Sequence, residues 1–150
     1  MDDHSTPPNL RQTPEPLRLC LVGCGGIAAA HLPAIVNHPD QFRLVAVADP
    51  NPANRKAVIQ EVRQSESVRE FSDFGESLAA MADTVEAVLV LTPHHLHFPA
   101  AMEAVKAGKP VLVEKPVCLN LEETRRMREA AARSGMAGMV GHKRRFAPAS

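Results

Sequence analysis

The sequence predicts an α/β fold built on a doubly wound parallel sheet. After residue 17, short apolar runs alternate repeatedly with segments of helical composition. The runs are apolar throughout instead of alternating with polar residues, which is typical of strands covered on both faces. The first run ends directly in glycines, as strands do where they enter a ligand-binding turn. The alternation of strands and helices along the chain favours a parallel sheet with helices on each side.

Each element has a local signal in the sequence. Apolar runs predict strands at 17–23, 42–50, 67–74, 86–93, 110–115 and 136–142. Composition predicts helices at 26–39, 51–64, 75–83, 97–108 and 120–135. Pro33 lies within the first helix and predicts a kink or a shorter helix, because proline removes a helical hydrogen bond.

Turn and cap residues mark several helix ends. Asn51 precedes a proline that suits the first helical position. Asn120 and Glu123 resemble a capping box, while Gly108 and Gly135 suit the position just after a helix. These residues predict where the chain turns back toward the sheet.

Length and charge restrict the classes of function. The chain of 150 residues is long enough for one compact domain, and its 17 basic residues balance 17 acidic ones. Neither a nucleic acid nor a membrane is therefore expected as a partner, and no apolar run approaches the roughly 20 residues that span a bilayer. Residues 1–17 read as a disordered, Pro-rich leader without the apolar core of a signal peptide. The expected location is the cytoplasm.

Cysteines and histidines raise the question of a metal site. Cys20, Cys24 and Cys118 fit neither a paired zinc motif nor a disulfide framework, so we expect reduced, structural thiols. Three histidines follow the fourth predicted strand in TPHHLHF, at residues 94, 95 and 97. Imidazole is a common metal ligand. However, no nearby acid or cysteine completes a set, so a loop beside a cofactor is the favoured interpretation and no metal is expected.

The segment GCGGIA, residues 23–28, fits the glycine motif of dinucleotide-binding domains. Gly23 can form the tight turn, Gly25 leaves room for a pyrophosphate, and Ala28 allows the helix to pack closely on the strand. Gly26 and Ile27 complete the turn into the helix, whose first N–H groups can bind phosphate oxygens. The alternative is a tight turn without a ligand.

An acid ends the next strand in the expected place. Asp49 lies 21 residues beyond Ala28 (49 − 28), where a carboxylate can bind the hydroxyls of a ribose. Because a carboxylate repels a 2′-phosphate, NAD is expected as the cofactor in preference to NADP. Arg55 lies on the following helix and either reaches a phosphate or is simply solvated.

Glu114, Lys115 and Pro116 follow a buried strand at the carboxyl edge of the predicted sheet. A lysine there can contact a ligand, bind a substrate hydroxyl or lower the pKa of a neighbour. An ordinary salt bridge at the strand end is the alternative.

Together these segments resemble the N-terminal half of the Gfo/Idh/MocA family, which includes glucose–fructose oxidoreductase and inositol dehydrogenase. The matching segments are VGCGGIAAAHLPAI, LVAVADPNPANRKA, AVLVLTPHHLHFPAAMEAVKAGKPVLVEKPVCLNLEE and MVGHKRRFAPA. The resemblance implies a dinucleotide-binding Rossmann domain at 18–142. It also implies that residues 143–150 begin the crossover to a C-terminal substrate domain that this chain lacks.

The resemblance implies a role for each matching residue. Cofactor-binding roles fall on Gly23, Gly25, Gly26, Ile27, Ala28, Asp49, Thr92, Pro93, His97, Glu114 and Lys115. Lys115 would also be catalytic through the substrate hydroxyl, and Arg145 would lie near the substrate cleft. His94 and Lys143 stand where the family often has amide side chains. We further expect a cis Lys115–Pro116 peptide bond, since a fixed proline can redirect the preceding lysine.

Two functions follow from the resemblance. The first is NAD-dependent hydride transfer to or from a hydroxyl of a sugar, polyol or related small molecule. The alternative is a truncated or stand-alone dinucleotide-binding module without turnover. Without a substrate domain, we expect exposed apolar surface near residues 136–150 and association of identical copies into a homo-oligomer.

Overall fold

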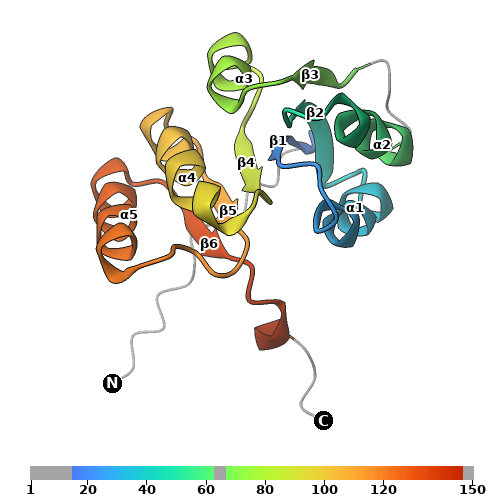
Figure 1. Ribbon diagram of the computed structural model, residues 1–150. Helices are drawn as coiled ribbons and strands as arrows, with labels where there is room; N and C mark the ends of the chain where they lie inside the picture. Colours follow the sequence, from blue (N-terminus) through green and yellow to red (C-terminus); the bar gives the residue numbers. More distant parts are fainter. Residues whose placement is uncertain (1–14, 63–66, 147–150) are drawn as a thin grey trace, which may run out of the picture.

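The computed structural model describes residues 15–62 and 67–146 (Figure 1). Most of the leader predicted at 1–17 lies outside these residues, as do the last residues of the predicted crossover at 143–150. The first strand begins at Leu17, so the final position of the predicted leader already belongs to the sheet. Residues 143–146 form a short 3₁₀ helix, η2.

The sheet has six strands in the order β3-β2-β1-β4-β5-β6, and each neighbouring pair is parallel. The strand bounds are β1 Leu17–Val22, β2 Phe42–Ala48, β3 Arg69–Phe71, β4 Ala87–Val90, β5 Val111–Val113 and β6 Gly138–Val140. The strand order reverses between β1 and β4, which creates a switch point at the carboxyl edge. The predicted doubly wound α/β fold is confirmed.

Helices cover both faces of this sheet (Figure 1). Their bounds are α1 Ala28–Asn37, α2 Pro52–Val62, α3 Phe74–Ala80, α4 His97–Lys106 and α5 Leu121–Ser134, with the 3₁₀ helix η1 at His94–Leu96. Helices α1 and α2 pack together beside β1 and β2, whereas α4 packs against α5 beside β4 and β5. Every predicted helix and strand is therefore present.

Caps explain where α5 begins and ends. The side chain of Asn120 accepts a hydrogen bond from the Glu123 N–H (2.9 Å), and the Glu123 carboxylate accepts one from the Leu119 N–H (3.1 Å). Gly135 follows the helix with φ +68°, a left-handed conformation that glycine adopts without a steric penalty. The capping signals in the sequence are thus confirmed.

Most elements are shorter than the sequence patterns suggest. Helix α1 begins at Ala28 instead of residue 26, because Gly25–Ile27 form the turn that leads into it. Pro33 lies inside α1 and does not end it. The helix is shorter than predicted because residues at both of its ends are not helical. Apolar residues beyond the strand ends, such as Leu91, are still buried, which explains why the patterns run longer than the strands.

The sheet separates two hydrophobic clusters. Side chains alternate along β1, so Leu19 and Leu21 pack with α1 and α2, while Cys20 and Val22 pack with α3 and α4. This alternation explains why all the central strands are apolar: each strand contributes to a core on both of its faces.

Coverage of the sheet is uneven. Helices α1 and α2 lie over β1 and β2, and they leave the same face of β4, β5 and β6 partly open. An apolar cavity of about 360 Å³ lies there, lined by residues that include Leu89, Leu112 and Met139. Met139 on the edge strand β6 is 56% exposed. Exposed apolar surface is therefore found within part of the expected region, and residues 147–150 lie outside the description.

We expect copies of the chain to associate through this open face, because exposed contiguous apolar surface promotes protein contacts. Met139→Lys should shift the chain toward monomer in sedimentation velocity, without changing its thermal midpoint.

Leu121→Lys is the matched control for this experiment, since Leu121 is 64% exposed on α5, outside the cavity lining. Sedimentation of the unmodified chain as a monomer at high concentration would contradict the expectation.

Candidate functional site

A cleft of about 780 Å³ opens at the carboxyl edge of the sheet, beside the switch point. Its walls come from the β1–α1 turn, the end of β2, the start of α3 and the segment between β4 and α4. Seven of the predicted site residues line it: Gly23, Gly25, Gly26, Ile27, Asp49, Thr92 and Pro93. The structure therefore brings the glycine motif, the acid and the fourth-strand segment to one place.

The β1–α1 turn is crowded at its first glycine and open at the two that follow. Gly23 has φ +88°, and a Cβ there would lie 2.6 Å from the Thr92 backbone nitrogen. By contrast, a Cβ on Gly25 or Gly26 would meet nothing within 4 Å. Gly23 therefore holds the turn against the end of β4, while Gly25 and Gly26 leave the cleft floor bare.

Helix α1 begins at this floor without a capping side chain. Ile27 precedes the helix and provides no side-chain hydrogen bond to its first turn. The buried Ala28, 1% exposed, packs among the residues beneath α1. The Ala28 and Ala30 N–H groups bond the Gly25 and Ile27 backbone oxygens, and the other N–H groups of this helix start are suited to bind an anion, as the glycine motif predicts.

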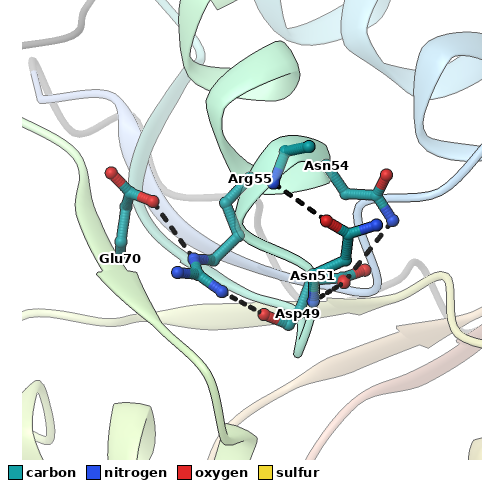
Figure 2. Close-up of polar contacts among 6 residues, drawn as sticks. Asp49, Asn51, Asn54, Arg55 and Glu70 are labelled. Carbon is teal, nitrogen blue, oxygen red and sulfur yellow. Dashed lines mark hydrogen bonds and ion pairs between the residues drawn. The ribbon is translucent and has the colours of Figure 1, made fainter.

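Asp49 joins the ends of β1 and β2. Its Oδ2 accepts a hydrogen bond from the Cys24 N–H (2.8 Å), and its Oδ1 accepts one from the Asn51 N–H (2.8 Å). The Asn54 side chain lies 3.5 Å from Oδ1 (Figure 2). The carboxylate thus positions the glycine turn itself, in addition to lining the cleft.

Arg55 is directed away from the cleft. Its Nη1 donates to the Asp49 backbone oxygen (2.6 Å), and its Nε donates to the Glu70 carboxylate on β3 (3.1 Å) (Figure 2). Only 14% of the Arg55 side chain is exposed. The sequence left two interpretations of Arg55, a phosphate contact and a solvated side chain, and neither describes this geometry.

The segment after β4 places a hydroxyl at the cleft. Thr92 lines the cleft, and its Oγ1 is buried without a hydrogen-bond partner among the described residues. A buried, unpaired hydroxyl is costly, and a polar group of a ligand could satisfy it. Pro93 and His94 continue the same wall.

His97 lies beneath this wall and is only 1% exposed. Its Nδ1 lies 2.6 Å from the Pro116 backbone oxygen, and its Nε2 lies 2.8 Å from the Thr92 backbone oxygen. The ring does not line the cleft, so His97 acts on the cleft through the backbone of its neighbours.

Glu114 is directed toward α1. Its Oε1 lies 2.7 Å from His31 Nε2, and its Oε2 accepts a hydrogen bond from the Lys115 N–H (3.0 Å). A Cβ on Gly141 would come within 2.7 Å of Oε1, so a side chain there would displace the carboxylate end of Glu114. The sequence did not reveal that Glu114 pairs with His31.

Opposing effects set the pKa of Glu114. Burial favours the neutral acid, but the hydrogen bonds from His31 and the Lys115 N–H, together with the charges of these residues, lower the pKa of Glu114 below its ordinary value. The net effect is an ionised carboxylate fixed at the end of β5.

Lys115 and Arg145 are exposed, and neither lines the cleft. The Lys115–Pro116 peptide bond is cis, which confirms the expectation from the sequence. Lys115 follows β5, the strand beside β4, so it leaves the sheet at the same edge as Thr92.

The described cysteines are free and buried or half-buried. Burial raises the pKa of the Cys20 thiol to about 11, and burial together with the Asp49 charge raises that of Cys24 to about 12. Neither thiol is therefore a nucleophile at neutral pH. Residues 15–62 and 67–146 contain no group of three or more histidine, cysteine or acidic residues placed to hold a metal ion.

Sequence reasoning missed several contributors to the site. Asn54, Phe74 and Glu103 line the cleft, and His31 binds Glu114. Asn54 follows Asp49 on the first turn of α2, which was a usable signal. Phe74 and Glu103 reach the cleft only because α3 and α4 pack together, a contact that no local pattern indicates.

Residues 17–142 match the model of an oxidoreductase family, GFO_IDH_MocA, described by its NAD-binding Rossmann fold. The chain belongs to this family. The match includes the glycine turn, Asp49 and the Glu114–Pro116 turn within one continuous segment. The chain is thus an NAD-binding domain of an oxidoreductase family.

Curated relatives include dehydrogenases of small hydroxylated molecules. An inositol 2-dehydrogenase of Corynebacterium glutamicum is 31% identical over 133 residues, which cover 88% of this chain and 38% of the relative. A 1-carboxy-3-chloro-3,4-dihydroxycyclohexa-1,5-diene dehydrogenase of Comamonas testosteroni is 35% identical over 139 residues, covering 87% of this chain and 31% of the relative. The chain thus spans about a third of the length of each of these relatives.

Solved structures share the same fold. The WlbA dehydrogenase of Chromobacterium violaceum, in complex with NADH and UDP-GlcNAcA, is 31% identical with a TM-score of 0.74, over 85% of this chain and 35% of that one. The WlbA dehydrogenase of Thermus thermophilus, in complex with NAD and α-ketoglutarate, is 31% identical with a TM-score of 0.76, over 88% and 43%. Within the described part of this chain, no helix has the length and apolarity needed to cross a membrane.

The Glu114–His31 contact makes acid stability testable. Because the folded-state pKa of Glu114 is lowered, its ionised form stabilises the fold above the ordinary glutamate pKa, and this contribution is lost as the pH falls through the acid range. We expect His31→Gln to lower the free energy of unfolding at pH 7 by about 1–2 kcal/mol. The loss of stability with acid should also be shallower than in the unmodified chain.

Urea unfolding from pH 7 to pH 3 measures both effects. His38→Gln is the matched control, because His38 is exposed at the end of the same helix. Equal unfolding midpoints for His31→Gln and the unmodified chain at pH 7 would show that the contact adds no stability.

Proposed function

We propose that the cleft binds NAD and that the chain serves hydride transfer between the nicotinamide and a hydroxyl of a sugar, polyol or related small molecule. The observation that carries the proposal is the bare glycine floor held against a buried, ionisable Asp49 at the switch point. This arrangement combines an anion site with a diol site in a single cleft.

The residues present fit the adenosine and pyrophosphate ends of NAD. Gly25 and Gly26 leave space for phosphates beside the uncapped start of α1. Asp49 Oδ1 accepts from the Asn51 N–H and lies near the Asn54 amide, whereas Oδ2 accepts from the Cys24 N–H and retains a lone pair for a ribose hydroxyl.

The geometry favours NAD over NADP. The Asp49 charge would repel a 2′-phosphate at the ribose position. Arg55, the nearest candidate to neutralise such a phosphate, is bound to Glu70 and to the Asp49 backbone. The preference for NAD therefore follows from the Asp49 carboxylate at the cleft and from Arg55, whose guanidinium is already bound to other groups.

The nicotinamide end would lie along Thr92 and Pro93, where the unpaired Thr92 hydroxyl can bind a carboxamide. NAD would supply the hydride acceptor. Lys115 would bind the substrate hydroxyl and accept its proton, and Arg145 would contact the substrate. Glu114 contacts His31 in the structure, so we assign it the positioning of Lys115 instead of direct cofactor contact.

Similarity supports the substrate class. The relatives of at least 30% identity include an inositol 2-dehydrogenase, and a structural neighbour carries NADH with a nucleotide-linked sugar acid. Both act on, or bind, ring compounds rich in hydroxyl groups.

A binding module without turnover is the second candidate. It is favoured by the exposure of Lys115 outside the cleft lining. Mixing the chain with NAD and a panel of polyols, and following absorbance of NADH, separates the candidates. Turnover that Lys115→Gln abolishes supports the oxidoreductase, whereas cofactor binding without turnover supports the module.

We expect the chain to enhance NADH fluorescence on titration and Gly25→Val to weaken binding by about tenfold or more, because the new side chain would occupy the phosphate space. Gly138→Val is the matched control, since a Cβ there also meets nothing within 4 Å and Gly138 lies on β6, away from the cleft. Absence of any fluorescence change at millimolar NADH would overturn the proposal.

We expect NADH to bind at least about tenfold more tightly than NADPH, a difference of about 1.4 kcal/mol. Asp49→Asn should narrow this preference, because it removes the charge that repels the 2′-phosphate.

Asp73→Asn is the control, since Asp73 also lines the cleft and asparagine can replace its cap on α3. Equal affinities of the unmodified chain for the two cofactors, measured by calorimetry, would contradict the assignment of Asp49.

A further inference from the structure

The buried ring of His97 has a partner at each nitrogen, and both partners are of the same kind. Nδ1 lies 2.6 Å from the Pro116 carbonyl oxygen and Nε2 lies 2.8 Å from the Thr92 carbonyl oxygen. A carbonyl oxygen only accepts hydrogen bonds, so each nitrogen must carry a proton to bind its partner.

A neutral imidazole cannot satisfy this arrangement. It carries a proton on one nitrogen and a lone pair on the other, so one lone pair would face a carbonyl oxygen at hydrogen-bond distance. Turning the ring over would place C–H groups opposite both carbonyls and would lose both hydrogen bonds. Only the doubly protonated ring donates to both oxygens.

We propose that His97 is held as an imidazolium cation, and that it is the positioning residue that fixes the Thr92–Pro93 wall of the cleft to the Lys115–Pro116 turn. Thr92 lines the cleft, and Pro116 directly follows the proposed catalytic lysine. The ring therefore sets the position of Lys115 relative to the cleft without contacting either a cofactor or a substrate.

The charge has a cost that the carbonyls offset. A buried cation loses its hydration, and the start of α4, where His97 lies, disfavours positive charge. Two short charge-assisted hydrogen bonds oppose these effects. The ring is thus expected to keep both protons only while the two turns stay in place.

The charged and titratable groups around the ring are few. On its own segment, the His94 ring lies 5.5 Å away, centre to centre, in an edge-on arrangement. Helix α5 contributes Arg126, which lies over the ring of Phe98. The segment around Pro116 carries Glu114, Lys115 and Cys118, of which Glu114 binds His31. No carboxylate is paired with His97 among these groups, which leaves the carbonyls as its counter-partners.

Ring ¹⁵N signals of the histidine-labelled chain test the charge directly. In water an imidazole is mostly neutral at pH 7.5. If both carbonyls accept a hydrogen bond from the ring, the His97 signals show two protonated nitrogens at that pH. A His97 ring with one unprotonated nitrogen at pH 7.5 would overturn the imidazolium.

Amide signals of the chain test the positioning role. His97→Gln retains a polar side chain but cannot reach both carbonyls, so we expect amide signals at Thr92 and Lys115 to shift together and their hydrogen exchange to rise about tenfold. His95→Gln is the matched control on the same segment, because His95 is exposed and does not line the cleft. Unchanged signals at Lys115 in His97→Gln would refute the positioning role.

Neither measurement requires a bound cofactor. A chain that fails to bind NADH would contradict the proposed function and would leave the ring and amide results valid. If His97→Gln does not fold, the ring signals of the unmodified chain decide the charge, and pH-dependent amide signals at Thr92 and Lys115 decide the positioning. Signals that move together when the ring loses its proton support the role, and independent movement refutes it.

Discussion

The hydrogen bonds of Asp49 are the interaction on which the cleft depends. This carboxylate ends β2 and accepts the Cys24 N–H from the turn after β1, so two neighbouring strand ends share one acid. Hydrogen bonds to a charged group contribute about 1.5–3 kcal/mol each, more than neutral ones. Gly23 completes the arrangement, because its lack of a side chain lets the same turn lie against Thr92. Three strand ends are thereby held in one geometry.

A second acid acts on α1 from the opposite side of the switch point. Asp49 holds the turn that precedes α1, and Glu114 holds His31 in the middle of the helix. The helix is therefore fixed by carboxylates from β2 and β5, on either side of the central strands. Each of the two acids binds protein donors at both of its carboxylate oxygens, so the position of each side chain at the sheet edge does not depend on a ligand.

Local chemistry made much of the fold predictable. Asn120, Gly135 and the glycine turn act over a few residues, and their roles follow from backbone geometry alone. The direction in which a side chain points does not follow in this way. Glu114 and His31 are 83 positions apart in sequence, so their contact depends on the packing of α1 against the end of β5.

The same limit applies to Arg55 and His97. Each of these residues follows a strand in the sequence, which places it at the carboxyl edge of the sheet. Tertiary packing, however, directs Arg55 to Glu70 and buries the His97 ring. Residues that line the cleft from α3 and α4 were missed for this reason. The sequence thus locates the strand ends that form the site, whereas the assignment of each side chain requires the packed structure.

The open face over β4 to β6 implies a gradient of local stability along the sheet. The edge strand β6 contributes three residues that are exposed or half-buried, and α5 contains no fully buried residue. Such a region opens at a lower free energy than the core around β1 and β2. The glycine turn and Asp49 therefore belong to the rigid half of the molecule, while Lys115 borders the half that opens first. The cleft floor therefore rests on the half that resists opening, whereas the turn of Lys115 depends on individual contacts, such as those of Glu114 with His31 and the Lys115 N–H, to keep its position.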